Sequence, residues 1–231
     1  DRRQRQMCIR DSLIRDHHPL LALLAAGLLG GVAGIVTGLL HTKLRIPSLL
    51  AGILSMIALY SVNLRIMGKA NVSLLGKETA FTYMETLGLD YAQSVFIVGL
   101  LATVVIGTLI YWFFGTEIGA AIRATGFNPQ MIRAQGIDTN VMLLLGLFLS
   151  NALTAMAGAF IGMNNGFFDV GMGVGTIVIG LASVIIGEVL FGTRSFKNSL
   201  VSVILGSIVY RFVIAIVLQM GMPPNDLKLF T

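Results

Sequence analysis

Two charged side chains stand inside long apolar segments of this chain, Glu188 and Arg211. An ionisable group at bilayer depth is costly, so it usually pairs with another polar group or faces a cavity. If the two segments are antiparallel neighbours joined by a short loop, the two depths differ by roughly one turn at about 1.5 Å rise per residue. We therefore favour an ion pair. The alternative is that Arg211 lines a solute route and meets a substrate carboxylate.

Further polar side chains in apolar segments are candidate hydrogen-bond donors along a solute pathway: Asn63, Asn151, Asn164, Asn165 and Tyr210. Each could instead make a hydrogen bond between packed helices, which we favour. No nucleophile with a neighbouring base and no paired carboxylates share a plausible pocket. His17, His18 and His41 are too separated for a metal site, and the single Cys8 excludes a cysteine-based one. The sequence thus predicts no catalytic residue, bound metal or cofactor.

The elements that position these residues are long apolar segments. Apolar residues make up 55% of the chain and charged residues 12%. A membrane-spanning helix needs about 20 mostly apolar residues, and runs this continuous do not fit the alternating pattern of a barrel. We predict an all-α polytopic membrane protein with six spans: Pro19–Leu40, Ile46–Leu64, Tyr91–Thr116, Thr139–Phe168, Val170–Gly187 and Asn198–Asn225.

Lys and Arg in the connecting loops set the expected orientation. Three loops that share one side of the membrane carry basic residues and are predicted to be cytoplasmic: Lys43 and Arg45, Arg123 and Arg133, and Arg194 and Lys197. The connection from Ile66 to Asp90 is then external and long enough for a short surface helix. Much of the net charge of +5 comes from five arginines before residue 16, so no basic patch suggests nucleic acid.

Glycines recur at helical spacing and predict close helix packing. They are Gly27 and Gly31, then Gly30, Gly34 and Gly38 in the first span, and Gly158 and Gly162 in the fourth. A helix interface that slides during transport is the functional alternative to ordinary packing. Residues 171–175, GMGVG, are either an irregular start that aims a helix N-terminus at a pathway or a plain external loop.

A polar stretch from Glu117 to Asp138 separates the third and fourth spans. Its first part predicts a helix up to Ala124, with Glu117 at the start, where the helix dipole favours an acid. Residues 125–129 predict a turn, with Asn128 capping a second helix and Pro129 in that helix's first turn. Gly136 predicts its end. This second helix would offer Phe127, Met131 and Ile132 beside Arg133, either to a partner's groove or to lipid headgroups.

The pattern Gly119, Ala121, Arg123-Ala124, Gly126, Asn128, Ala134 and Gly136-Ile137 resembles the cytoplasmic coupling loop of ABC-importer permeases, in the family that contains branched-chain amino acid and ribose permeases. Blocks at residues 37–75, 171–192 and 222–230 extend the resemblance over nearly the whole chain from Leu20. It implies an ATPase-coupling role for one set of residues: Glu117, Gly119, Ala121, Arg123, Ala124, Gly126, Phe127, Asn128, Met131, Arg133, Ala134, Gly136 and Ile137.

The resemblance further implies a permease subunit in the bacterial inner membrane that moves a small solute, such as an amino acid, inward. ATP would be bound and hydrolysed by a separate ATPase, an external binding protein would deliver the solute, and the permease would form a homodimer. Residues 1–12 are expected to be a non-native segment, and residues 13–231 a permease domain truncated at both ends. The alternative function is an ion-coupled secondary transporter, which would want acidic groups at mid-membrane, where only Glu188 comes near.

Overall fold

The computed structural model describes residues 19–68, 71–73, 90–169 and 176–219. The chain divides into two compact units, Asp1–Val170 and Gly171–Thr231. The predicted non-native segment at residues 1–12 and the GMGVG stretch lie outside the described residues. Five described helices are long and apolar enough to cross a membrane, and a shorter apolar helix covers Ile179–Phe191. The all-α polytopic fold class is confirmed.

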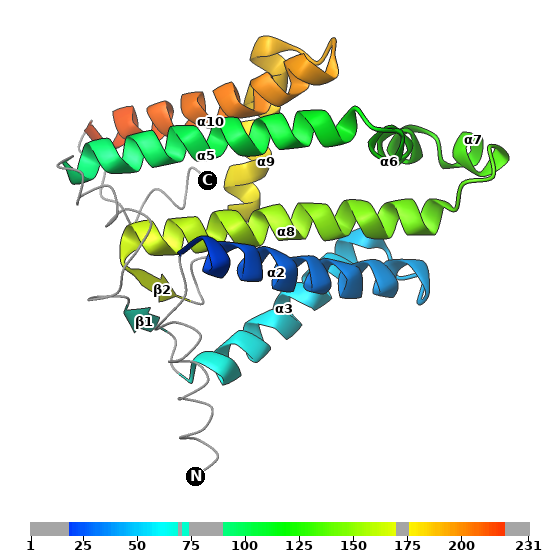
Figure 1. The fold of residues 1–231 in the computed structure, drawn as a ribbon, viewed down its shortest axis with the longest axis horizontal. Helices are drawn as coiled ribbons and strands as arrows, with labels where there is room; N and C mark the ends of the chain where they lie inside the picture. Colours follow the sequence, from blue (N-terminus) through cyan, green and yellow to red (C-terminus); the bar gives the residue numbers. More distant parts are fainter. Residues whose placement is uncertain (1–18, 69–70, 74–89, 170–175, 220–231) are drawn as a thin grey trace. The chain divides into compact units, whose positions relative to one another are not determined.

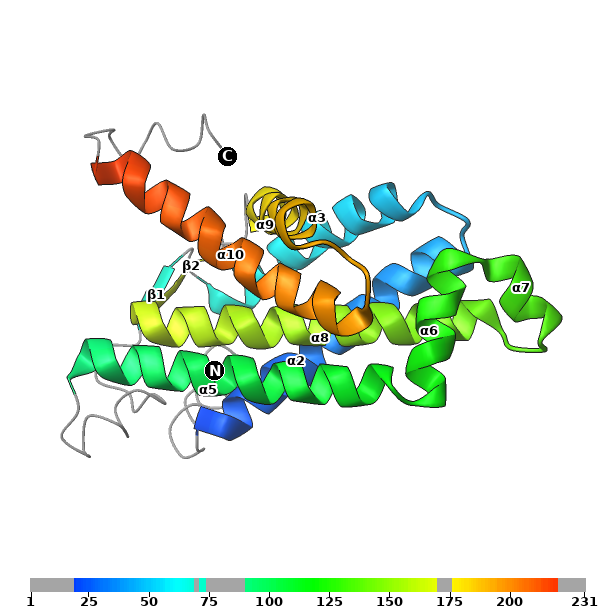
Figure 2. The same ribbon diagram turned by 90° about the horizontal axis from the view of Figure 1, so that it is seen from above.

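The first unit contains six described helices and two short strands (Figure 1). The elements are α2 (Pro19–Thr42), α3 (Ser48–Met67), β1 (Asn71–Ser73), α5 (Tyr91–Phe114), α6 (Glu117–Phe127), α7 (Pro129–Ala134), α8 (Thr139–Asn165) and β2 (Phe167–Asp169). Figures 1 and 2 show α5 and α8 running in opposite directions, with α6 and α7 at one end of this pair and the two strands at the other.

Close packing of α2 on α8 follows the predicted glycines. A Cβ atom added at Gly34 would overlap the backbone oxygen of Leu147, and one at Gly31 would overlap the ring of Phe148. Gly27, Gly30 and Gly38 face α8 in the same way. A side chain at any of these positions would push the two helices apart, so this part of the packing prediction is confirmed.

The prediction for the fourth span needs two corrections. Gly158 has open space around it, and Gly162 faces the ring of Phe168 in β2 rather than another helix. The helix also ends at Asn165 instead of continuing to Phe168, because Gly166 adopts a left-handed conformation with φ of 71° and stops it. The residues beyond form β2, which pairs with β1 in antiparallel register, Asn71 opposite Asp169 and Ser73 opposite Phe167.

The third span and the external connection also differ in detail. α5 ends at Phe114, two residues earlier than predicted, and α3 ends at Met67, where Gly68 has a φ of 68°. Asn71–Ser73 form a strand. The rest of this connection, residues 69–70 and 74–89, lies outside the described residues, and so does the short surface helix considered for it.

The second unit is a helix pair, α9 (Thr176–Phe191) and α10 (Phe196–Gln219). A Cβ atom at Gly187 would overlap the backbone oxygen of Ser202, and one at Gly206 would overlap that of Ser183. The hydroxyl of Ser202 donates to the backbone oxygen of Gly192 at 2.8 Å. These contacts show that the backbone of α9 lies directly against that of α10. α9 also continues past the predicted end at Gly187, to Phe191.

Candidate functional site

The polar stretch between α5 and α8 folds as two short helices at one end of the first unit. Thr116 caps α6, since its Oγ1 accepts a hydrogen bond from the Gly119 backbone N–H at 3.3 Å and donates to the Phe113 oxygen at 2.6 Å. Glu117 lies in the first turn, as predicted. Gly119 is buried, and an added Cβ would overlap the backbone of Phe113. Glycine there lets α6 fold back tightly from the end of α5.

The corner between α6 and α7 is tighter than the sequence predicts. α6 continues through Phe127, three residues beyond Ala124, and Asn128 alone separates the two helices. The reason lies at Thr125, which is buried and donates its hydroxyl hydrogen to the Ala121 oxygen at 2.7 Å, so the helix continues through it. The predicted turn at residues 125–129 is thus wrong in its extent.

The predicted start and stop of α7 are confirmed. Asn128 Oδ1 accepts from the Met131 backbone N–H at 3.2 Å, and Pro129 occupies the first turn. Asn128 is extended at φ of −148°, which reverses the chain between the two helices. Gly136, with φ of 82°, ends the segment in a conformation that glycine adopts at little cost.

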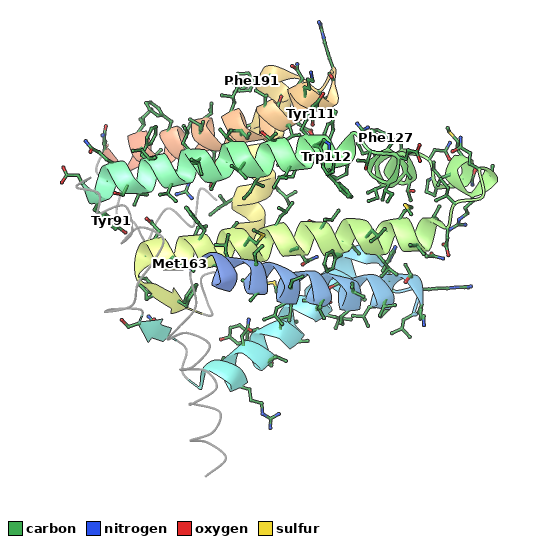
Figure 3. The ribbon with its side chains drawn as sticks, viewed as in Figure 1. Tyr91, Tyr111, Trp112, Phe127, Met163 and Phe191 are labelled. Carbon is green, nitrogen blue, oxygen red and sulfur yellow. The ribbon has the colours of Figure 1, made fainter. Side chains whose placement is uncertain are left out.

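The two apolar faces of this corner have opposite environments. Phe127 is 91% exposed and Met131 is also exposed, whereas Ile132 is only 3% exposed. The prediction that Ile132 is offered to a partner is therefore wrong, because α7 uses this side chain to pack against its own unit. Figure 3 shows Phe127 at the α6 end of the molecule's first unit. The exposed ring at the end of α6 is therefore followed by a helix, α7, that a buried side chain holds in place.

A side-chain hydrogen bond ties α7 to the first turn of α8, and α8 has a side-chain cap of its own. Arg133 Nε donates to Thr139 Oγ1 at 2.9 Å, and Thr139 is 4% exposed. Asp138 Oδ1 accepts from the Asn140 backbone N–H at 2.8 Å and so caps α8. The Ile137 backbone N–H donates to the Ile132 oxygen at 3.3 Å. These contacts hold α7 against the start of α8, the long helix on which α2 packs.

The remaining predicted coupling residues spread over both short helices and the link to α8. Ala121, Arg123, Ala124 and Ile137 are half-buried, whereas Gly126 and Ala134 are exposed. Gly146 of α8 lies against the Ile122 side chain, so α6 packs on α8 as well as on α5. The predicted set therefore forms one continuous region, but its members divide between surface and packing positions.

The structure scatters the predicted pathway residues. Asn63 is exposed on α3. Asn151 Nδ2 donates to the Leu147 oxygen at 2.9 Å, and its side chain lies against Gly34 of α2. This places Asn151 in helix packing. Asn164 lies at the far end of α8, where its backbone oxygen accepts from the Tyr91 hydroxyl at 2.7 Å.

In the second unit, Glu188 and Arg211 are both exposed, and no ion pair joins them among the described residues. Tyr210 is 8% exposed, and its hydroxyl has no hydrogen-bond partner in the part of the chain that the structure describes. The structure thus brings neither the proposed ion pair nor a cluster of pathway donors together. The solute-route alternative for Arg211 stays a prediction.

Aromatic side chains mark both ends of α5. Tyr91 is its first residue, and Tyr111 and Trp112 are exposed near its last turn (Figure 3). At about 1.5 Å per residue the two groups lie roughly 30 Å apart, which matches the hydrocarbon thickness of a bilayer. Tyr and Trp are enriched at membrane interfaces. α5 therefore has the aromatic pattern of a spanning helix, with the α6–α7 corner just outside one interface.

Sequence reasoning missed the burial of three residues in this region: Thr125, Ile132 and Thr139. Only Thr139 had a local signal, because it follows Asp138, a common cap residue, at the start of an apolar helix. The burial of Thr125 and Ile132 depends on contacts with other helices.

Comparison with known proteins settles the family. A family model described as the permease component of branched-chain amino acid transport systems matches residues 4–230. The chain belongs to this permease family. The permease is 40% identical over 220 residues to a tyrosine transport system permease protein of Clostridioides difficile, which covers 95% of this chain and 72% of that protein.

Two further relatives match the chain at lower identity. An uncharacterized Rickettsia prowazekii protein is 32% identical over 90% of the permease and 74% of its own length. An autoinducer 2 import system permease protein of Yersinia pseudotuberculosis is 26% identical over 87% of the permease and 55% of its own length. No solved structure matches the chain.

The family resemblance seen in the sequence is therefore confirmed. The permease is a multi-pass inner-membrane protein and the transport subunit of an ABC importer for a small solute. It is a transport protein and not an enzyme. The alternative of an ion-coupled secondary transporter is set aside by the family.

Proposed function

We propose that the permease moves an amino acid inward, with L-tyrosine as the first solute to test. The support is the tyrosine transport permease at 40% identity, a higher identity than that of the autoinducer 2 permease at 26%. ATP is bound and hydrolysed by a separate ATPase, and the permease itself carries no cofactor. An external binding protein delivers the solute, and two permease copies form the translocation unit.

The α6–α7 corner is the docking site for the ATPase. The observation that carries this proposal is Phe127, a 91% exposed aromatic ring at the end of α6. Met131 on the next helix, α7, is also exposed, and the buried Ile132 anchors α7. A rigid apolar knob of this kind fits a groove in a partner. Burial of one large aromatic side chain at the centre of an interface commonly dominates the binding energy.

The contact from Arg133 to Thr139 gives this docking site a mechanical consequence. ATPase closure that moves α7 also moves the first turn of α8, because the hydrogen bond from Arg133 to Thr139 joins the two helices. α8 in turn carries α2 through glycine contacts. The pair is therefore the element whose movement alternates access. Asn63, Asn151, Asn164, Glu188, Tyr210 and Arg211 remain candidate contacts along the pathway.

The competing role for the corner is a helix that rests on lipid headgroups. Phe127 would then insert into the bilayer interface, and no partner would be needed. The two roles differ in what a charge at Phe127 does. If Phe127 binds a groove of the ATPase, an aspartate there would prevent binding and abolish coupling. If Phe127 rests at the polar membrane interface, an aspartate would leave transport largely intact.

The experiment compares Phe127→Asp with Leu44→Asp in the full-length transporter, reconstituted with its ATPase and binding protein. Leu44 is an exposed apolar residue in the α2–α3 loop on the same predicted side. We expect Phe127→Asp to lower ATP-driven L-tyrosine uptake by about tenfold or more, as loss of a central aromatic contact does. Leu44→Asp should keep normal uptake.

Equal uptake by both variants would contradict the docking site. No uptake of any amino acid by the unaltered transporter, with ATP and binding protein present, would contradict the proposed solute class.

A further inference from the structure

The first unit contains an open cavity of about 650 Å³ at the end opposite the α6–α7 corner. β1 contributes Asn71 and Ser73 to its lining, the start of α5 contributes Tyr91, and the end of α8 contributes Asn164 and Asn165. Sites for small molecules usually enclose roughly 300–1,000 Å³, so the cavity is large enough for a single amino acid or sugar.

The polar wall is assembled by long-range contacts. Tyr91 donates its hydroxyl hydrogen to the Asn164 backbone oxygen at 2.7 Å, which joins the start of α5 to the end of α8. Gly166 turns the chain back with φ of 71°, so that β2 can pair with β1. Residues from three separate parts of the sequence therefore form one wall of the cavity.

The chemistry of the lining selects a class of ligand. Its described side chains carry amides and hydroxyls, which both donate and accept hydrogen bonds, and none of them carries a formal charge. Met163 and Phe167 supply an apolar patch beside them. Figure 3 shows Met163 and Tyr91 at the same end of the unit. A net-neutral solute with several polar groups and an apolar part fits this lining, whereas a net charge would find no counter-charge among these groups.

The position of the cavity gives its side of the membrane. α8 has 27 residues. At about 1.5 Å per residue it is roughly 40 Å long, enough to cross a hydrocarbon layer of about 30 Å. The corner and the cavity are at its two ends, as Figure 1 shows through the places of α7 and β2. If the corner is cytoplasmic, the cavity opens to the outside.

We propose that this cavity, defined by Asn71, Ser73, Tyr91, Asn164 and Phe167, is an external solute-receiving site of the permease, selective for net-neutral polar solutes. In the amino acid series these are zwitterions with uncharged side chains. The proposal rests on the proposed function for its solute class. It adds the site, the side of the membrane and the exclusion of acidic and basic amino acids.

The test is protection from labelling. Ser73→Cys is made in the permease with Cys8→Ser, and intact cells react with a membrane-impermeant maleimide. Gln93→Cys is the matched control, because Gln93 is exposed near the same end of α5 and is not part of the lining. We expect external labelling of both, with L-tyrosine slowing the Ser73→Cys reaction severalfold and leaving Gln93→Cys unchanged. L-Lysine and L-glutamate should give no protection.

A second variant measures the contribution of the lining. Asn164→Ala in the Ser73→Cys background should raise the half-protecting L-tyrosine concentration by about fivefold, as expected for one lost neutral hydrogen bond. If Ser73→Cys does not reach the membrane, Asn71→Cys replaces it.

Four results would overturn the proposal. These are labelling only after permeabilisation, equal protection by all three amino acids, an unchanged half-protecting concentration in Asn164→Ala, or no protection while ATP-driven uptake of L-tyrosine proceeds. Failure of uptake itself would overturn the proposed function instead, so the two failures are distinguishable in the same cells.

Discussion

At the scale of single residues, glycines decide where helices of this permease can touch. Gly187 and Gly206 bring the backbones of α9 and α10 together so closely that neither position has room for a Cβ atom. Gly180 of α9 has open space around it. The same residue type thus has opposite consequences within one helix. Alanine substitutions at these glycines can therefore separate the effect of helix–helix contact on stability from the effect of helix propensity.

We predict that Gly206→Ala destabilises the α9–α10 pair by about 1–3 kcal/mol, the usual range for overpacking. Gly180→Ala should instead be neutral or stabilise by up to about 1 kcal/mol, because alanine favours the helix. Thermal unfolding of the purified full-length protein in detergent measures both. Equal behaviour of the two variants would refute the close approach of the two backbones.

A second residue-scale prediction concerns the hydrogen bond between Arg133 and Thr139. Thr139→Val keeps the shape of a buried side chain but removes the acceptor, and it should cost about 1 kcal/mol. In a double-mutant cycle with Arg133→Ala, the two effects should be non-additive by a similar amount. Strict additivity would show that the contact contributes nothing.

At the scale of elements, α7 is anchored to the rest of its unit, and α6 ends in an exposed aromatic side chain. α7 is held by Ile132 and by its link to α8, while Phe127 projects from the end of α6. A short helix has little stability of its own, so its position depends on this tertiary anchor. The anchor and the projection should therefore have separable effects on stability and on transport.

We expect Ile132→Ala to destabilise the corner by about 2–5 kcal/mol, since it removes a buried branched side chain. Phe127→Ala should leave stability nearly unchanged, because the ring is exposed. Limited proteolysis between α6 and α8 reports the loosening. Rapid cleavage in Phe127→Ala but not in Ile132→Ala would reverse the assigned roles.

At the scale of the whole molecule, the sequence predicts local features and misses distant ones. The long apolar runs, the Asn128–Pro129 helix start and the Gly136 stop were predictable because their signals lie within a few residues. The pairing of Asn71 with Asp169 was not, because it joins residues far apart in the chain. The burial of Ile132 and the loss of space at Gly187 likewise depend on partners that no local pattern names.

The same distinction applies to the candidate sites. The corner proposed for docking lies in one continuous stretch, so its two short helices were predictable from the sequence, although Ile132 was expected to face outward and is buried. The external cavity draws on β1, α5 and the end of α8, and of its lining only Asn164 and Asn165 were singled out from the sequence as possible pathway residues. Sites built from a single segment are accessible to pattern analysis, whereas sites built from several need the fold.

The central claim is that an ATPase docks on the α6–α7 corner, and crosslinking from Phe127 tests it most directly. A photoreactive phenylalanine analogue replaces Phe127 in the full-length permease, and Leu29, an exposed residue of α2, serves as the control position. We predict that light links a nucleotide-binding ATPase subunit to position 127 and not to position 29. Crosslinks from position 127 to lipid alone, in cells that still transport the solute, would contradict it.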